Sequence, residues 1–253
     1  MGQILIIEGE DFSGNPNAVN INDFPVVTDG LIGFYTGNGS QSDANGIVSM
    51  PSIVVPGQPF TRIAGQERSP VYYSGSTVFK GMVLRSASDD FTTAPGLEQT
   101  LNIDFVEGIS FTFMTYRPAG TGPTGSTNRC ILGIESIALQ FRTLCSSTSQ
   151  HLAIGSTNYD IGYGVLPSAA EAITVVITKT SFLFYRDGAL VSTTDISGES
   201  LPDSDVTRVT YGSNWSGASA LLQGQTKQIH IHNKALSLGE VQDIHAVLPN
   251  LVL

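Results

Sequence analysis

Basic residues are scarce in this chain. Its 253 residues include 12 lysines and arginines against 22 aspartates and glutamates, so the formal net charge is −10. Proteins that bind nucleic acid need clustered lysine and arginine to neutralise phosphates, and the sequence contains no such cluster. We therefore expect no nucleic-acid partner and no attraction to anionic membrane surfaces, which leaves neutral or cationic partners.

Cysteine is almost absent as well. Two cysteines, Cys130 and Cys145, are too few for the disulfide framework of a small secreted protein. They either face each other across neighbouring strands and pair, or they are free buried thiols. The sequence leaves both alternatives open.

Long apolar runs are also missing. The short apolar run at residues 4–7 is followed at once by Glu8 and Glu10, which is not the pattern of a secretory signal peptide. No stretch is long enough to span a bilayer as a helix. We expect synthesis in the cytoplasm without a signal peptide, and no insertion into a membrane.

Glycine and proline, in contrast, are plentiful at 27 and 12 residues, and only 13% of the residues are charged. Short segments of alternating apolar and polar residues are separated by turn residues, which is typical of antiparallel sheets. No internal repeat is visible, which disfavours solenoids and propellers. The alternation predicts strands at residues 31–35, 47–50, 52–55, 71–73, 78–84, 101–106, 109–116, 130–134, 137–142, 152–155, 172–178, 182–186, 189–193, 206–212 and 228–232.

The last expected strand carries apolar residues on one face and histidines on the other. Side chains alternate along a strand, so Ile229 and Ile231 share one face while His230 and His232 share the opposite one. Two histidines at this spacing supply two of the three or four ligands that a metal site needs. No motif ties the other two histidines to this pair, so we expect both side chains to face solvent or a partner.

The spacing after this strand predicts a helix that begins at Ser237. Ser237 and Glu240 form the S-x-x-E capping box, in which each side chain bonds the backbone amide of the other residue. Leu236 before the cap and Val241 in the first turn complete a hydrophobic staple. A helix this short is marginal alone, so we expect it to pack on one edge of a sheet. The apolar stripe of the helix consists of Leu238, Val241, Ile244 and Leu248.

Four stretches occur in an order that resembles laminin-G-like and concanavalin-A-like domains. Residues 224–246 resemble the last strand and helix of that family, and residues 182–191 resemble the Y-x-D-G hairpin before it. Residues 29–35 are similar to the opening strand, and residues 108–116 to an internal strand that carries a tryptophan in the family. The resemblance implies an all-β fold, a two-sheet antiparallel β-sandwich or jelly roll with one short C-terminal helix.

Residues 29–253 are expected to form this sandwich as a single domain, because all-β domains of this size are common. Residues 1–28 differ from the rest. Residues 3–8 are consistent with an edge strand, and residues 11–17 are rich in turn formers. This segment resembles the N-terminal collars of bacteriophage tail and other virion proteins. We expect an attachment or oligomerisation arm that packs either on its own sandwich or on a neighbouring subunit.

The only tryptophan, Trp215, follows Asn214 and is close in sequence to Tyr211, in a stretch that we expect to form a loop next to the last strand. Aromatic rings stack on sugar C–H groups while amides and hydroxyls bind sugar hydroxyls, so this loop is a candidate glycan site. Tyr72 and Tyr73 are further candidate ligand-binding aromatics. The alternative is that Trp215 plugs the open end of the core.

Two acidic pairs are candidate calcium ligands, because laminin-G-like relatives hold Ca²⁺ at one rim with aspartate carboxylates and backbone carbonyls. The pairs are Asp203 with Asp205 and Asp89 with Asp90, both expected in loops. Neither pair has the EF-hand pattern. The alternative is that these residues are solvated loop acids.

The resemblance also raises the question of catalysis, because the same fold hosts polysaccharide-cleaving enzymes. A retaining glycosidase needs two carboxyl groups about 5 Å apart, and acids at alternate positions of one strand would supply them. The sequence contains no strand with three acids in that register. We therefore expect that the protein is not an enzyme.

We expect a non-catalytic structural or adhesion module that is associated with a virion or another extracellular assembly. Its rim loops would bind a cell-surface glycan or another virion protein, and the chain would form a homo-oligomer. The alternative is a polysaccharide-degrading enzyme of the same fold, either a glycosidase or a lyase.

Overall fold

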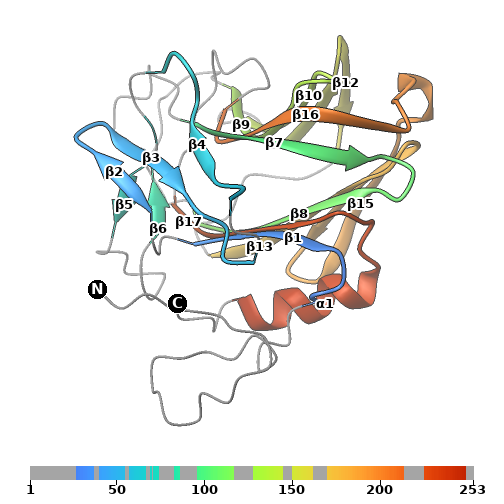
Figure 1. Ribbon diagram of the computed structural model, residues 1–253. Helices are drawn as coiled ribbons and strands as arrows, with labels where there is room; N and C mark the ends of the chain where they lie inside the picture. Colours follow the sequence, from blue (N-terminus) through green and yellow to red (C-terminus); the bar gives the residue numbers. More distant parts are fainter. Residues whose placement is uncertain are drawn as a thin grey trace.

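The computed structural model describes residues 27–36, 40–54, 57–66, 69, 71–73, 83–85, 96–116, 128–144, 150–161, 170–213 and 225–248. In this part of the chain, 17 strands form two antiparallel sheets, together with the 3-10 helix η2 (Ser197–Glu199) and the α-helix α1 (Leu238–Val247). The sheets pack face to face, and α1 lies on the outer side of one of them (Figure 1). The structure confirms the expected β-sandwich with a short C-terminal helix.

Sheet A lies next to the helix. It consists of β1 (Leu31–Tyr35), β5 (Val71–Tyr73), β6 (Val83–Arg85), β8 (Ile109–Tyr116), β13 (Glu171–Ile177), β14 (Ser181–Arg186), β15 (Ala189–Asp195) and β17 (Gln225–His232). The strand order is β15-β14-β13-β8-β17-β6-β5. Strand β1 pairs with β17 on the same side as β6, further along the strand.

Sheet B forms the other layer. It consists of β2 (Gln41–Asp43), β3 (Gly46–Met50), β4 (Phe60–Arg62), β7 (Leu97–Asp104), β9 (Asn128–Ile134), β10 (Leu139–Leu144), β11 (Gln150–Ile154), β12 (Thr157–Asp160) and β16 (Ser204–Tyr211). The strand order is β12-β11-β10-β9-β16-β7-β4-β3-β2. Both sheets therefore combine strands that are distant in sequence.

Most of the predicted strands are present, and the exceptions have a physical reason. Strands β2, β4 and β12 were not predicted, because they are only three or four residues long and mostly polar. The predicted strand at 52–55 contributes one isolated bridge, between Ser52 and Tyr35. The edge strand expected at residues 3–8 lies outside the described residues.

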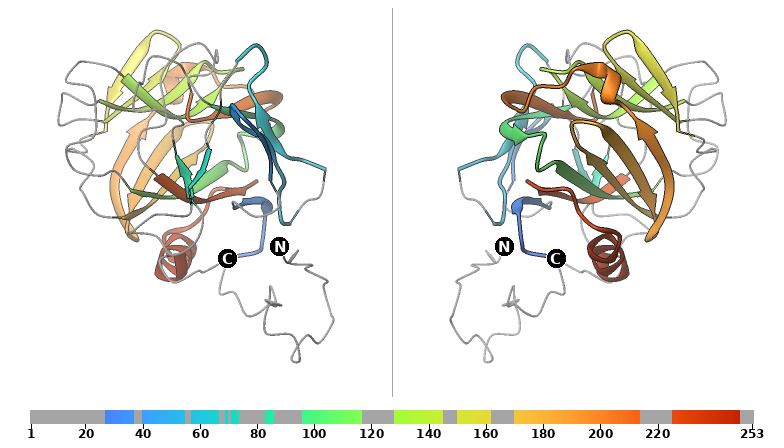
Figure 2. Two further views of the ribbon diagram at one scale, coloured as in Figure 1. Left: turned by 90° about the vertical axis from the view of Figure 1, so that its left-hand side faces the viewer. Right: turned by 90° about the vertical axis from the view of Figure 1, so that its right-hand side faces the viewer.

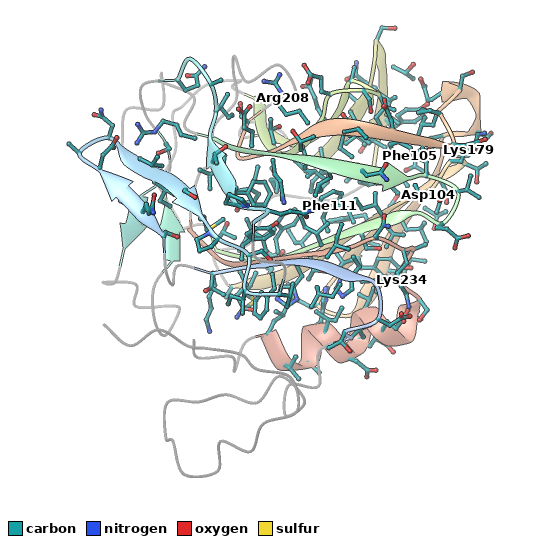
Figure 3. All side chains as sticks on the ribbon, in the orientation of Figure 1. Asp104, Phe105, Phe111, Lys179, Arg208 and Lys234 are labelled. Atoms are coloured by element: carbon teal, nitrogen blue, oxygen red, sulfur yellow. The ribbon has the colours of Figure 1, made fainter. Side chains whose placement is uncertain are left out.

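The core fills the space between the two sheets. Strand β7 alternates between buried and more exposed residues along its whole length, as expected for a strand with one face on a core. In β8, Ile109, Phe111 and Phe113 face the core and are at most 1% exposed, which confirms the predicted face. Figure 3 shows Phe111 between the sheets, and Phe105 near the end where β7 turns into β8.

The hairpin of β14 and β15 was predicted from its Asp187-Gly188 turn, and the structure confirms it. Both turn residues have positive φ, +47° at Asp187 and +80° at Gly188. Asp-Gly is a favoured pair for such a turn because aspartate tolerates this region and glycine has no Cβ to clash.

Figure 2 shows α1 beside the outer face of sheet A. A second, smaller apolar cluster lies between the two. It consists of Met114, Ala172, Val176, Tyr185, Leu236, Val241, Ile244 and Leu248. The helix therefore covers the outer face of sheet A over β8, β13 and β14, and it also contacts the edge strand β15, so it extends further over the face than the edge position that we expected. The predicted stripe is wrong at Leu238, which is the first residue of the helix and is 47% exposed.

The start of α1 is fixed as the sequence predicts. The Ser237 amide donates to Glu240 Oε2 at 2.8 Å, and the Glu240 amide donates to Ser237 Oγ at 3.4 Å. Lys234 Nζ lies 2.7 Å from Glu240 Oε1. These bonds, first that from Lys234 and then that from the Ser237 amide, lower the pKa of Glu240 to about 2. The cap is therefore intact over the whole neutral range.

The turn between β7 and β8 holds the segment that leads into α1. Gly108 has φ +86°, and a Cβ at this position would lie 2.9 Å from Ala235 Cβ and 3.2 Å from the Ile177 carbonyl oxygen. The Ala235 amide donates to the Glu107 carbonyl at 2.9 Å. Only glycine satisfies both the backbone conformation and the close approach.

We expect Gly108→Ala to lower the free energy of unfolding by roughly 2–4 kcal/mol, because it adds a steric clash to the cost of positive φ. Gly155→Ala is the matched control, since Gly155 has φ +56° and open space around its Cβ position. It should lower the stability by only about 1–2 kcal/mol. Urea unfolding measures both; equal costs for the two variants would show that the close approach to Ala235 is wrong.

Candidate functional site

The outer faces of the two sheets differ in their exposure. On sheet A, the outward residues Ser110, Thr112 and Thr174 are fully buried. On sheet B, the outward residues Thr100, Asn102 and Val206 are exposed, and Val206 is 67% exposed. In the described part of the chain, the centre of sheet A is therefore covered on its outer side, whereas the outer side of β7 and β16 in sheet B is accessible.

We call this accessible surface the open face. Its centre is the pair β7 and β16, in which Thr100 lies opposite Arg208 and Asn102 lies opposite Val206. Because opposite residues of an antiparallel pair project to the same side, these four side chains form one patch. The patch is completed by two carboxylates, from Glu98 on β7 and from Glu135 in the turn after β9.

Arg208 is held between these two carboxylates. Its Nη1 lies 3.2 Å from Glu98 Oε2, and its Nη2 lies 3.0 Å from Glu135 Oε1. Glu98 is itself fixed, because its Oε1 accepts from the Ala64 amide at 3.1 Å. Figure 3 shows Arg208 on the side of sheet B that faces away from sheet A. A planar donor fixed by two acceptors gives the open face a pre-organised set of polar groups.

The open face offers hydrogen-bond donors and acceptors with little charge imbalance. One guanidinium is flanked by two carboxylates, and the neighbouring residues, Thr100 and Asn102, are neutral. Such a surface can bind hydroxyl or amide groups of a ligand without a large desolvation cost for an unpaired charge. It is chemically suited to a sugar or to a polar protein surface.

Sequence reasoning did not single out Arg208, Glu98 and Glu135. Arg208 lies 110 residues from Glu98 and 73 from Glu135, so no local motif contains the three. The available signal was the alternation of β7, which predicts that Glu98, Thr100 and Asn102 share one face.

Tyr211, which was predicted as a ligand-binding aromatic, lies in the core. It is fully buried, its ring stacks on Phe113 with centroids 5.4 Å apart, and its hydroxyl bonds Thr226 on sheet A. Burial raises the pKa of its hydroxyl far above the ordinary value. A surface role for Tyr211 is therefore wrong; the residue links the two sheets.

The other predicted aromatics are placed only in part. Tyr72 and Tyr73 lie in β5, the edge strand of sheet A, where a strand was predicted. In the strand register Tyr72 pairs with Leu84, and Leu84 pairs with Thr226. Thr226 is also the residue that the Tyr211 hydroxyl bonds. Tyr72 and Tyr211 therefore belong to the same end of the sandwich. Asn214 and Trp215 lie outside the described residues.

The predicted calcium ligands lie at the opposite end. Asp203 and Asp205 are at the start of β16, and Tyr211 is its last residue, about 23 Å away along an eight-residue strand. The Asp203 carboxylate forms an ion pair with Lys179. Figure 3 shows Lys179 at the end of the sandwich where Asp104 ends strand β7. Asp89 and Asp90 lie outside the described residues, so calcium binding stays a prediction.

The two histidines of β17 do not face solvent as we expected. His230 and His232 are both fully buried, on the side of sheet A that carries α1. The alternation with Ile229 and Ile231 is as predicted. The prediction was wrong about the face that carries the histidines, which is covered instead of exposed. Within the described residues, no three histidine, cysteine, aspartate or glutamate side chains are grouped so that they could hold a metal ion.

The pairing of the two cysteines is not tested. Cys130 lies in β9 with its backbone opposite Arg142 of β10, and Cys145 lies outside the described residues. As for membranes, none of the helices among the described residues has the length and apolar character needed to cross a bilayer.

No protein-family model matches the chain, and no curated protein is detectably similar in sequence. In three dimensions the chain is similar to domain 4 of AbnA, a GH43 extracellular arabinanase from Geobacillus stearothermophilus, solved in complex with arabinotriose. The TM-score is 0.53 and the identity 14%, and the match covers 85% of this chain and 98% of that domain.

Two further structures are similar over the same part of the chain. Trypanosoma rangeli sialidase in complex with the inhibitor DANA matches with TM-score 0.58 and 12% identity, over 87% of this chain and 33% of that one. The binding domain of botulinum neurotoxin DC, in complex with rat synaptotagmin II, matches with TM-score 0.55 and 12% identity, over 87% and 52%. This chain thus spans nearly all of the arabinanase domain, half of the toxin domain and a third of the sialidase. At these identities, the similarity shows the fold alone.

We expect Tyr211→Phe to lower the free energy of unfolding by about 1–2 kcal/mol, because it leaves the buried Thr226 hydroxyl without its partner. Tyr159→Phe is the control, since the Tyr159 hydroxyl bonds Glu199 at a half-buried position. It should change the stability by about 0.5 kcal/mol or less. Thermal unfolding measures both, and an unchanged Tyr211→Phe variant would contradict a linking role for this hydroxyl.

Proposed function

We propose that the chain is a non-catalytic recognition module that binds a neutral glycan through the open face and the adjoining rim loops. The observation that carries this proposal is the asymmetry of the sandwich: sheet A is covered by α1, whereas sheet B presents an exposed, polar and pre-organised patch around Arg208. A module of this design can bind through one sheet without disturbing its core.

The charge of the patch favours a neutral ligand over an anionic one. Glu98 and Glu135 together outweigh the single guanidinium of Arg208, and the whole chain has net charge −10. An acidic sugar would be repelled by both. A neutral sugar meets only hydrogen-bonding partners, in Thr100, Asn102 and the ends of the ion-pair network.

Two of the similar structures support a binding role. The arabinanase domain was solved with arabinotriose, a neutral sugar, and the toxin binding domain with a receptor protein. The first supports the glycan proposal, because this chain spans nearly the whole of that domain. The second supports a polar protein surface as the other kind of ligand.

We further propose that the module belongs to a virion or another extracellular assembly, where it acts as a homo-oligomer. The support is the likeness of residues 1–28 to virion collars together with the predicted role of this segment as an arm. Native mass measurement separates the possibilities, since a monomer at micromolar concentration would contradict the oligomer.

A glycan array tests the proposed binding face. The double variant Thr100→Ala/Asn102→Ala should lose at least tenfold in affinity for neutral glycans, because it removes the neutral hydrogen-bonding groups of the open face. The matched control is Thr193→Ala/Asn233→Ala, which changes the same residue types at exposed positions associated with sheet A. The control should bind like the natural protein.

Trp215→Ala in the same assay tests the predicted rim site. A loss with this variant alone, and none with the Thr100/Asn102 variant, would move the site from the open face to the rim. Binding that survives in both variants contradicts the proposal as a whole. Circular dichroism of each variant confirms that the fold is intact.

The second candidate function is polysaccharide cleavage, and one observation favours it. Glu98 and Glu135 bind the two ends of one guanidinium, so two carboxylates share a small area of the open face; glycosidases use such pairs. A screen that detects reducing ends and unsaturated sugars should find no product above background. Release of product that is abolished by Glu98→Gln or Glu135→Gln would replace the binding proposal with a catalytic one.

A further inference from the structure

The interface between α1 and sheet A contains a buried layer of polar groups beside its apolar cluster. The layer consists of Ser110, Thr112, Thr174, His230, His232 and His245, none of which is more than 6% exposed. Three of the chain's four histidines therefore lie in one buried interface. Buried polar groups are tolerated when they are hydrogen-bonded, so the pattern of donors and acceptors decides what the layer can do.

His245 connects α1 to the turn between β14 and β15 and to strand β13 through directed hydrogen bonds, and Thr174 extends this connection to β8. The Gly188 amide donates to His245 Nδ1 at 2.7 Å, so Nδ1 carries no proton. The proton of the neutral ring is then on Nε2, which lies 2.7 Å from Thr174 Oγ1 and donates to it. Thr174 Oγ1 lies 2.8 Å from Thr112 Oγ1, so the series of hydrogen bonds continues to β8.

His230 and His232 are also held in their neutral form. His232 Nε2 lies 2.8 Å from the Val27 carbonyl oxygen, which only accepts, so Nε2 carries the proton. His230 Nε2 lies 3.0 Å from Gln228 Oε1 in the same arrangement. The Nδ1 atoms of both rings are buried and have no hydrogen-bond partner among the described residues. A second proton on either ring would therefore have no acceptor.

Several elements of this interface carry further charged and titratable groups. They are Glu240 and Asp243 on α1, Glu171 on β13, Tyr185 and Arg186 on β14, Asp187 in the following turn, Lys227 on β17, and Lys234 with Asp29 beside the start of the helix. Asp187 attracts a proton to His245, but burial outweighs this attraction and lowers the pKa of His245 to about 4. Burial also lowers the pKa of His230 to about 3 and that of His232 below its ordinary value.

We propose that His245 makes α1 an acid-released cover of sheet A. A proton on Nδ1 of His245 displaces the Gly188 amide and brings a positive charge into the layer that holds His230 and His232. When α1 leaves the sheet, the His245 ring reaches water and takes up this proton without penalty. The outer face of sheet A, with Met114 and Tyr185, is then exposed.

The direction of the effect follows from proton uptake. The closed form binds fewer protons than the open form between the ordinary histidine pKa of 6.5 and the lowered value of about 4. The closed form is therefore fully favoured above pH 6.5, and it loses about tenfold in its equilibrium constant per pH unit below that value for each proton taken up. For His245 alone, the loss at pH 5.0 is about 30-fold. Glu240 responds in a separate, more acidic window, because its pKa is lowered to about 2.

Amide hydrogen exchange at pH 7.0 and pH 5.0, corrected for the intrinsic rates, tests this proposal. Protection of residues 241–248 should fall by about 30-fold or more at pH 5.0, while protection of β7 and β16 stays unchanged. In His245→Gln, the fall in protection between the two pH values should be about 30-fold smaller than in the natural protein, because the contribution of His245 is lost. His151→Gln is the matched control, because His151 lies on β11 of sheet B, and it should keep the natural response.

Thr174→Val separates the titration of His245 from its structural role. This variant removes the acceptor of His245 Nε2 and weakens the helix contact, but it keeps the titrating ring. Its helix should be less protected at both pH values and still respond to acid. The proposal is overturned if natural α1 keeps its protection at pH 5.0, if the core strands lose theirs in parallel, or if His245→Gln responds like the natural protein.

Discussion

The central strands of sheet A are buried on both of their faces, and this constraint organises the molecule. On β8, Phe111 and Phe113 enter the core between the sheets, while Ser110 and Thr112 are fully buried on the opposite side. The same holds for β17, with Ile229 and Ile231 on one face and His230 and His232 on the other. A sheet buried on both faces needs a third layer, and α1 supplies it in the described part of the chain.

The need for this third layer explains why several interactions fix the start of the helix. A ten-residue helix is marginal in isolation, so its capping box and its apolar contacts must act together. Lys234 joins Glu240 of the cap to Asp29 before β1, so the same ion pairs connect the helix to the first described strand. The connection closes the structure around sheet A and leaves the outer face of β7 and β16 in sheet B accessible.

Local features of the fold were predictable from sequence, because they depend on residues a few positions apart. The Asp187-Gly188 turn, the Ser237–Glu240 box and the alternation around Ile229 each follow from short-range sterics or hydrogen bonding. The burial of Tyr211 was also predictable, because Tyr211 is two positions after the core residue Val209 and therefore shares its face of the strand. Its position at a strand end, next to a loop, led to the wrong assignment to the surface.

The site itself was beyond sequence reasoning for a physical reason. Alternation shows that a strand has two faces, but it does not show which face receives another layer. His230 and His232 were therefore assigned to solvent although α1 packs on their side of the sheet. Arg208, Glu98 and Glu135 come together only through the pairing of β7, β16 and β9, and no local pattern reports such long-range pairing.

The account depends most on α1 sealing sheet A while the face of sheet B stays open. Hydroxyl-radical footprinting of the protein at pH 7.5, with and without a bound neutral glycan, addresses both parts at once. The account predicts that Val206 is oxidised in the free protein and protected by the glycan, and that Met114 stays unmodified in both samples, although methionine is easily oxidised. Rapid oxidation of Met114 in the free protein, or glycan protection confined to the helix side, would contradict it.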